Sequence, residues 1–291
     1  MKKIAIYGQY LQDESLDTFS HVLNELQQRN CDIHIVKTYV KLLQDQLDIS
    51  SCNQFTVLDD SYDLMISIGG DGTILRAVSY VGKLNIPVMG INTGRLGFLA
   101  TLQPDGLQHA FSSLFEGKYN LSKRTLITAS SNNENNHAAP DNFALNEITV
   151  SRMNTTSMIQ IETHLNDELL TSYWADGLII STPTGSTGYS LSCGGPVISP
   201  QTDALVITPI APHNLNARPL VIPDHTTIKI KVKGRENEFL ASLDNRIASY
   251  PDETEITIKK ADFTIDLIQL ENASFIKTIR HKLLWGEDKR N

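Results

Sequence analysis

An apolar run that passes through a glycine-rich turn into a helical pattern limits the possible folds of this chain more than any other stretch. Leu64–Ile68 is typical of a buried parallel strand. Apolar residues then recur at helical spacing from Ile74 to Val81. The turn between the two is Gly69-Gly70-Asp71-Gly72-Thr73. Because the first amides of a helix lack partners and favour negative charge, we predict a phosphate site at this turn.

Asp71 is the unusual residue of this turn, since a carboxylate repels a bound phosphate unless a metal ion or a transferable proton lies between them. We therefore predict that Asp71 takes part in chemistry beside the phosphate. The alternative is that Asp71 only caps the helix that follows, which is a common role for aspartate.

The spacing of this turn excludes the commonest phosphate-binding motifs. No Lys-Ser or Lys-Thr pair follows the glycines, so the turn is not a Walker-type loop. The first apolar run, residues 4–8, carries one glycine only and therefore lacks the dinucleotide fingerprint. The string Gly69–Thr73 instead resembles a loop shared by NAD kinases, glycerolipid and sphingosine kinases and, with serine as the last residue, phosphofructokinases.

The amino-acid composition excludes several classes of protein. The 291 residues are 41% hydrophobic and 20% charged, which is ordinary for globular domains. The net charge of −8, without a basic run longer than a pair, argues against nucleic-acid binding. Cys31, Cys52 and Cys193 are too far apart for a disulfide framework or a zinc site, and they suit a reducing compartment. No apolar run approaches the ~20 residues of a membrane helix, so we expect a cytoplasmic protein without a membrane partner.

The first part of the chain alternates strand and helix patterns, which predicts an α/β domain with a parallel sheet and a Rossmann-like arrangement. The expected strands are residues 3–7, 32–37, 64–68 and 87–92, and the expected helices are 15–29, 38–47, the segment after Gly72, and 104–117. Ligands of such sheets gather at the carboxyl ends of the strands. We therefore expect the glycine turns after residues 68 and 91 to line one crevice.

After residue 119 the pattern changes to short alternating segments, which predicts an all-β domain of two layers. The expected strands include residues 144–151, 157–165, 178–181, 204–208, 227–232, 238–242, 255–260 and 263–270. The polar stretch 130–136 is predicted to be a hairpin tip.

Residues 274–285 return to helical spacing, and a single amphipathic helix needs an apolar partner. We predict that this helix packs back on the first domain. The expected organisation is an α/β nucleotide-binding domain at residues 1–122, a β-sandwich at 123–272 and the returning helix at 273–291.

Two stretches of the second half carry further candidate site residues. Asn146-Glu147 lies in an expected strand, where glutamate is disfavoured unless it is exposed or paired, so a solvent-facing pair is the alternative to a binding role. Residues 182–195 are rich in glycine and hydroxyl side chains, which suit sugars and phosphates, and the Tyr189 ring offers a flat face to a base. Arg246 follows a predicted turn and could pair with a phosphate. His213 fits a structural role better than a catalytic one.

Five strings together resemble the NAD kinase family in order and spacing. They are Gly69–Thr73, Asn146-Glu147, Asp176-Gly177, Thr182–Gly195, and Pro212-His213 with Arg218-Pro219-Leu220. The resemblance implies a first domain like that of phosphofructokinases and diacylglycerol kinases. It also implies transfer of the γ-phosphate of ATP to the 2′-hydroxyl of the adenosine ribose of NAD, with Asp71 as the catalytic base. Some family members use inorganic polyphosphate as the donor.

The same resemblance implies a set of NAD-binding residues. They are Asp71, Gly72, Arg76, Asn146, Glu147, Trp174, Asp176, Thr187, Gly188, Tyr189, Ser190, Leu191, Ser192, Ala211 and Arg246. No protein ligand for a metal is implied; the divalent cation, Mg²⁺, is expected to arrive with ATP. A homo-oligomer, either a dimer or a tetramer, is expected to share the site between subunits.

Some positions depart from the family pattern. Gly188 stands where alanine is common, and Asn245-Arg246 stands where Gly-Gln is usual. Trp174 occupies a variable position that is linked to the choice between NAD and NADH.

Two other functions stay open at this point. A lipid kinase would share the aspartate turn but would need an apolar acceptor pocket, whereas Thr184–Ser192 is mostly hydroxyl and glycine. A non-catalytic NAD-binding regulator would use Asp71 only as a helix cap.

Overall fold

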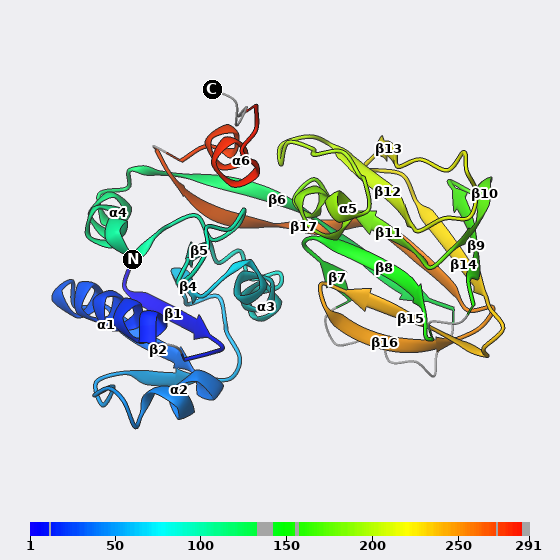
Figure 1. Ribbon diagram of the computed structural model, residues 1–291. Coiled ribbons are helices and arrows are strands. Elements are labelled where there is room, and N and C mark those ends of the chain that lie inside the picture. The colour runs from blue at the N-terminus through cyan, green and yellow to red at the C-terminus, as the bar shows by residue number, and fades with distance from the viewer. Residues whose placement is uncertain (12, 133–141, 155–156, 272, 287–291) are drawn as a thin grey trace. The chain divides into compact units, whose positions relative to one another are not determined.

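The computed structural model describes residues 1–11, 13–132, 142–154, 157–271 and 273–286, which belong to two compact units (Figure 1). Unit 1 comprises Met1–Lys123 and Ile265–Asn291, and unit 2 comprises Arg124–Thr264. The chain passes from one unit to the other within two strands, β6 (Tyr119–Ser131) and β17 (Glu255–Leu270). None of the helices in the described ranges has the length and hydropathy that crossing a bilayer requires.

Unit 1 is built on a parallel sheet, as the alternation of strands and helices predicted. Five strands lie in the order β5-β4-β1-β2-β3, and every pair is parallel. Their bounds are β1 Lys3–Gly8, β2 Asp32–Val36, β3 Asn53–Phe55, β4 Leu64–Ile68 and β5 Val88–Ile91. The last part of β17 adds to the free edge of β5 in parallel, with Leu267 opposite Val88. All five residues of β4 are buried, as expected for an interior parallel strand.

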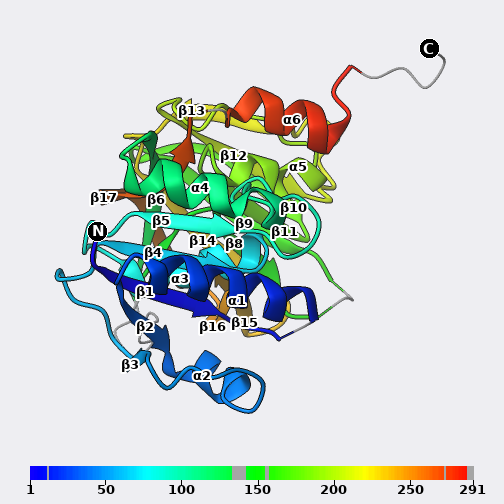
Figure 2. The ribbon, with the colours of Figure 1, turned by 90° about the vertical axis from the view of Figure 1, so that its left-hand side faces the viewer.

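Helices cover both faces of this sheet: α1 and α4 lie on one face and α3 on the other (Figures 1 and 2). The helices of unit 1 are α1 Asp13–Gln28, α2 Lys37–Leu43, α3 Asp71–Val81, the 3₁₀ turn η1 Pro104–Gly106, α4 Leu107–Phe115 and α6 Phe275–Leu283. Ser274 caps α6, because its hydroxyl oxygen accepts a hydrogen bond from the Lys277 N–H at 3.2 Å.

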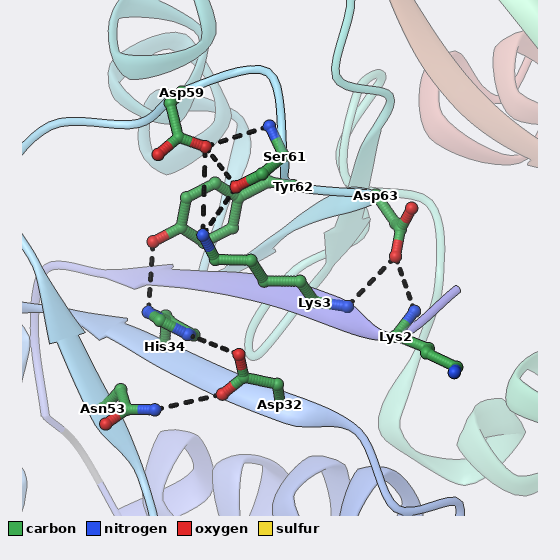
Figure 3. Close-up of polar contacts among 9 residues, drawn as sticks. All are labelled: Lys2, Lys3, Asp32, His34, Asn53, Asp59, Ser61, Tyr62 and Asp63. Carbon is green, nitrogen blue, oxygen red and sulfur yellow. Dashed lines mark hydrogen bonds and ion pairs between the residues drawn. The ribbon is translucent and has the colours of Figure 1, made fainter.

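A network of polar contacts lies at the end of this sheet where β1 and β2 begin (Figure 3). The Asp63 carboxylate accepts hydrogen bonds from the N–H groups of Lys2 at 2.5 Å and Lys3 at 3.0 Å. His34 lies between Tyr62, whose hydroxyl is 3.1 Å from Nδ1, and a carboxylate oxygen of Asp32, 3.0 Å from Nε2. The network lies at the opposite end of the strands from Asp71, which follows the end of β4. We therefore assign it to holding the strands together and not to the site.

Unit 2 contains two layers of strands, as predicted for an all-β domain. One sheet has the order β13-β12-β11-β8-β15-β16 and is antiparallel throughout. Its strands are β8 Glu147–Arg152, β11 Gly177–Ser181, β12 Ala204–Ile210, β13 Leu220–Pro223, β15 Glu238–Leu243 and β16 Arg246–Pro251. The other layer contains β9 Ile159–Leu165, β10 Glu168–Ala175, β14 Ile228–Lys233, β7 Phe143–Ala144 and parts of β6 and β17.

The two layers share one buried apolar core. It includes Ile148, Val150, Leu178, Ile180, Leu205, Ile207 and Phe239 from the first sheet and Ile159, Ile161, Ile228, Ile230, Ile256 and Ile258 from the second. The two sheets therefore pack face to face as a sandwich.

Three details differ from the sequence-based expectation. The expected strands 255–260 and 263–270 are one strand, β17, because the exposed pair Lys259-Lys260 interrupts the alternation without breaking the ladder. The second expected domain, residues 123–272, is longer than unit 2, which ends at Thr264, and the division between Lys123 and Arg124 lies inside the continuous strand β6. Of the predicted hairpin tip at 130–136, residues 130 and 131 end β6, and residues 133–136 lie outside the described residues.

Candidate active site

The turn after β4 has the backbone geometry that the glycines predicted. Gly69 has φ of +146°, and a Cβ there would lie 2.3 Å from Thr73 Oγ1, so a side chain is excluded. α3 begins at Asp71, with Gly70 as its N-cap and without a side-chain capping bond. Neither Gly70 nor Gly72 has an atom within 4 Å of an added Cβ. The start of α3 is therefore open to a ligand that approaches the backbone.

Asp71 does not cap its own helix; it holds the loop that follows β5. Its Oδ2 accepts a hydrogen bond from the Phe98 N–H at 2.8 Å, and its Oδ1 accepts bonds from the N–H groups of Leu99 at 3.0 Å and Ala100 at 2.9 Å. The capping alternative is therefore wrong for this structure. These bonds also bring the two glycine turns of unit 1 side by side, as predicted.

The loop of residues 94–100 is fixed from three directions. Besides Asp71, the Asn92 side chain donates to the carbonyls of Arg95 at 2.7 Å and Ala100 at 3.2 Å. Lys282 of α6 donates to the Leu96 carbonyl at 2.6 Å and lies 5.2 Å from the Phe98 ring centre. A Cβ on Gly97 would lie 1.9 Å from Asp71 Oδ1, so only glycine lets the carboxylate approach the loop.

The glycine- and hydroxyl-rich segment of unit 2 is more ordered than its composition suggests. It contains η2 (Gly185–Thr187) and the short helix α5 (Tyr189–Ser192). Several hydroxyls bond protein atoms: Thr182 Oγ1 donates to the Leu145 carbonyl at 2.5 Å, and Ser190 Oγ lies 2.8 Å from Thr208 Oγ1. The Tyr189 side chain, 46% exposed, is free to stack on a ring. Part of the hydrogen-bonding capacity of these hydroxyls is therefore used within the protein.

Asn146 and Glu147 lie at the start of β8, and both carry buried polar atoms without a partner. Neither Asn146 Oδ1 nor Glu147 Oε2 has a hydrogen bond to any described residue. The pKa of Glu147 is raised to about 7, first by burial and second by the nearby Asp244 carboxylate, while the Tyr189 N–H acts in the opposite direction. The alternative of a solvent-facing pair is therefore wrong. Unpaired buried acceptors are costly, and a ligand with donor groups would satisfy them.

The remaining expected residues lie in different surroundings. Arg76 is exposed on α3, and Asp176 pairs with Arg152 at 2.9 Å. Trp174, 49% exposed, lines an open groove of about 520 Å³ together with Ser157, Met158, His213 and Arg235. Ala211 has φ of +45° at the end of β12.

The Arg246 guanidinium is engaged by its own hairpin. Its Nε donates to the Leu243 carbonyl at 3.1 Å, and the guanidinium also bonds the Phe143 carbonyl and lies 5.3 Å from the Phe143 ring centre. Asp71, Gly72 and Arg76 belong to unit 1, and all the other expected NAD-binding residues belong to unit 2.

Sequence reasoning missed two charged residues of unit 2, the buried Asp244 and the half-buried Arg124. Asp244 accepts hydrogen bonds from three consecutive backbone amides that include Asn146 and Glu147. Burial lowers the pKa of Arg124 to about 10; its Nε has no partner among the described residues, and Thr184 Oγ1 lies 3.5 Å from its Nη1. The signal that could have drawn attention to Arg124 is a charged side chain within the segment that forms β6. Within the described ranges, no group of three or more His, Cys, Asp or Glu could hold a metal ion.

Comparison with known proteins agrees with the motifs. Family models described as the ATP-NAD kinase N-terminal and C-terminal domains match residues 11–119 and 145–270. NAD kinases of Christiangramia forsetii and Flavobacterium psychrophilum are 55% and 53% identical over 99% of this chain and 100% of their own lengths. The crystal structure of yeast NADH kinase with NADH shares the fold, with a TM-score of 0.87 and 24% identity over 99% of this chain and 89% of that chain. The chain therefore belongs to the NAD kinase family.

Proposed function

We propose that this chain transfers the γ-phosphate of ATP to the 2′-hydroxyl of the adenosine ribose of NAD and that Asp71 is the general base. The chain is an enzyme, an NAD kinase whose substrates are NAD and ATP. The observation that carries the role of Asp71 is its place at the start of α3, where a carboxylate lies beside open glycine backbone. The full-length similarity to NAD kinases supports the substrates.

The chemistry needs a proton acceptor and a place for the transferred group. As the ribose oxygen bonds to phosphorus and ADP leaves, the hydroxyl proton passes to the Asp71 carboxylate. A carboxylate offers about four lone-pair positions. Three of the Asp71 positions accept loop amides, so one is left for the hydroxyl. The amides at the start of α3 would bind phosphate oxygens. A divalent cation bound to the ATP phosphates would offset their charge.

We propose different binding roles for the two parts of the chain. Residues 1–122 would bind the nucleotide and the transferred phosphate. Residues 123–272 would bind NAD through Asn146, Glu147, Trp174, Asp176, Thr187, Gly188, Tyr189, Ser190, Leu191, Ser192, Ala211 and Arg246, together with Asp71, Gly72 and Arg76 of the first domain. The helix at 273–291 would support the first domain, and the bond from Lys282 to the Leu96 carbonyl favours this role.

Assembly and location belong to the same proposal. A homo-oligomer, dimer or tetramer, would share the site between subunits. A cytoplasmic location is supported by cysteines that are free in the structure, Cys31, Cys52 and Cys193.

The direct test is to incubate the purified full chain with ATP, Mg²⁺ and NAD and to follow NADP with an NADP-specific dehydrogenase. NADP should accumulate in proportion to enzyme and time. Absence of NADP above the background of a reaction without enzyme would refute the assignment. Parallel reactions with diacylglycerol or sphingosine test the lipid-kinase alternative, for which we expect no phosphorylated lipid. A non-catalytic regulator would bind NAD but form no NADP.

A further inference from the structure

Asp244 lies at the tip of the β15–β16 hairpin, and its backbone is bound to the start of β8. Asp244 and Asn245 both have positive φ, 46° and 68°, as a two-residue turn of type I′ requires. The Asp244 side chain is buried, and its own N–H donates to the Glu147 carbonyl at 3.2 Å. The tip of the hairpin is therefore anchored in the protein.

The Asp244 carboxylate binds three consecutive amides. Oδ2 accepts from the Leu145 N–H at 2.5 Å, and Oδ1 accepts from the N–H groups of Asn146 at 2.8 Å and Glu147 at 3.1 Å. From the other side, the Thr182 N–H donates to the Asn146 carbonyl at 2.9 Å. Hydrogen bonds to a carboxylate are stronger than neutral ones, so this segment of backbone is rigidly held.

The side chains on this rigid segment offer acceptors to a ligand. Asn146 Oδ1 and Glu147 Oε2 are buried without partners among the described residues. NAD carries ribose hydroxyls and a carboxamide NH₂, which are donors. An ionised Glu147 would accept from such donors about twice as strongly as a neutral acid.

The negative charge of Asp244 is one cause of the raised pKa of Glu147. Burial raises the pKa of Asp244, while the three amides and Arg246 act in the opposite direction. Glu147 faces Asp244 and the Tyr189 N–H, and no cation contributes to its electrostatic surroundings. The pKa of Glu147 is raised to about 7, first by burial and second by the Asp244 carboxylate, so Glu147 changes its charge near neutral pH.

We propose that Asp244 is a positioning residue of the NAD site: it fixes the backbone of Asn146 and Glu147, and its charge beside Glu147 makes NAD binding strengthen as the pH rises through neutrality. The proposal rests on the proposed function. Asp244 does not touch NAD; it acts through Glu147 and Asn146.

The test is Asp244→Asn, which keeps the size of the side chain and tolerates positive φ. The dissociation constant of NAD is measured without ATP by titration calorimetry from about pH 5 to about pH 9, and the KM values for NAD and ATP are measured in the coupled assay. We expect the KM for NAD to rise roughly 10-fold to 100-fold, with a smaller change in the KM for ATP. The midpoint of the pH dependence of NAD binding should move down by about one pH unit, because a like charge has been removed.

Two further variants complete the experiment. Asp252→Asn is the matched control, since Asp252 also binds a backbone amide, that of Gly234 at 2.8 Å, but lies beyond the other end of β16. It should leave the pH midpoint of NAD binding unchanged. Glu147→Gln should abolish the change in NAD affinity near pH 7, and it decides the role of charge even if Asp244→Asn does not fold.

The inference is overturned if wild-type NAD affinity is constant through neutral pH, or if a folded Asp244→Asn protein keeps both the wild-type KM and the wild-type midpoint. A purely structural role would raise the KM for NAD and for ATP together without moving the midpoint. If the wild-type chain neither binds nor phosphorylates NAD, the proposed function itself has failed, and this result is distinguishable from the first two.

Discussion

Replacing Asp71 by asparagine should reduce the kcat for NAD phosphorylation at least about 100-fold while NAD still binds. The amide oxygen of asparagine is far too weak a base to take the ribose proton. Expected NAD binding is close to that of the wild type, because most of the proposed NAD-binding residues lie in unit 2. The measurements are kcat from NADP formation and the dissociation constant of NAD without ATP.

Asp71→Asn also disturbs the loop of residues 94–100, because its NH₂ group would meet loop amides that now donate to a carboxylate oxygen. Lys282→Met separates the two effects. It removes the bond to the Leu96 carbonyl on the other side of the same loop and leaves the carboxylate in place. We expect Lys282→Met to retain most of the kcat. An Asp71→Asn enzyme with near wild-type turnover, or an equal loss in Lys282→Met, would contradict the role of Asp71 as the base.

Gly185→Ala should damage both the stability and the NAD affinity of the chain. A Cβ on Gly185 would lie 2.1 Å from the carbonyl oxygen of Asn146, which is backbone and cannot rotate away. The backbone segments that contain Gly185 and Asn146 must therefore move apart. The expected loss in the free energy of unfolding is about 3 kcal/mol. For a chain of this size the melting temperature should fall by roughly 6–12 °C. The KM for NAD should rise at least about tenfold, because Asn146 moves.

The matched control for Gly185→Ala is Gly106→Ala in unit 1. A Cβ on Gly106 would meet only the end of the Leu102 side chain at 3.6 Å, which is ordinary contact, and the Gly106 backbone has negative φ. Its melting temperature should stay close to that of the wild type. Equal melting temperatures for the two variants would show that the contact between Gly185 and Asn146 carries no strain.

The spacing of apolar residues predicted the fold class because, in most elements, the residues at that spacing are the ones that the structure buries. β4 is apolar and wholly buried, and α3 buries Ile74, Ala77, Val78 and Val81 as its spacing predicted. Several strands were not predicted: β3 has three residues and is mostly exposed, β13 is exposed at three of its four positions, and the longer strands β6, β10 and β16 were not named either. An edge strand has little apolar signal, since its pairing depends on a neighbour elsewhere in the chain.

The geometry of the candidate site was predictable where it depends on neighbouring residues, and the contacts between distant segments were not. The Gly69–Thr73 turn was identified from its own residues. No local pattern indicates that Asp71 binds amides 27 to 29 positions later, or that Asp244 binds amides 97 to 99 positions earlier. Both carboxylates are short acidic side chains next to a turn, where a cap is the default expectation. Only the tertiary structure shows what each one binds.

The division of the chain between the two units has a consequence for its synthesis. Domains generally fold on the ribosome from the N-terminus onward. Unit 2 is continuous and complete once Thr264 has emerged, whereas unit 1 still lacks the end of β17 and α6. Unit 1 is therefore complete only after residues beyond Thr264 have been synthesised, because the strand next to β5 and the Lys282 bond to the Leu96 carbonyl depend on these residues. A nascent chain of this protein should finish its second unit before its first.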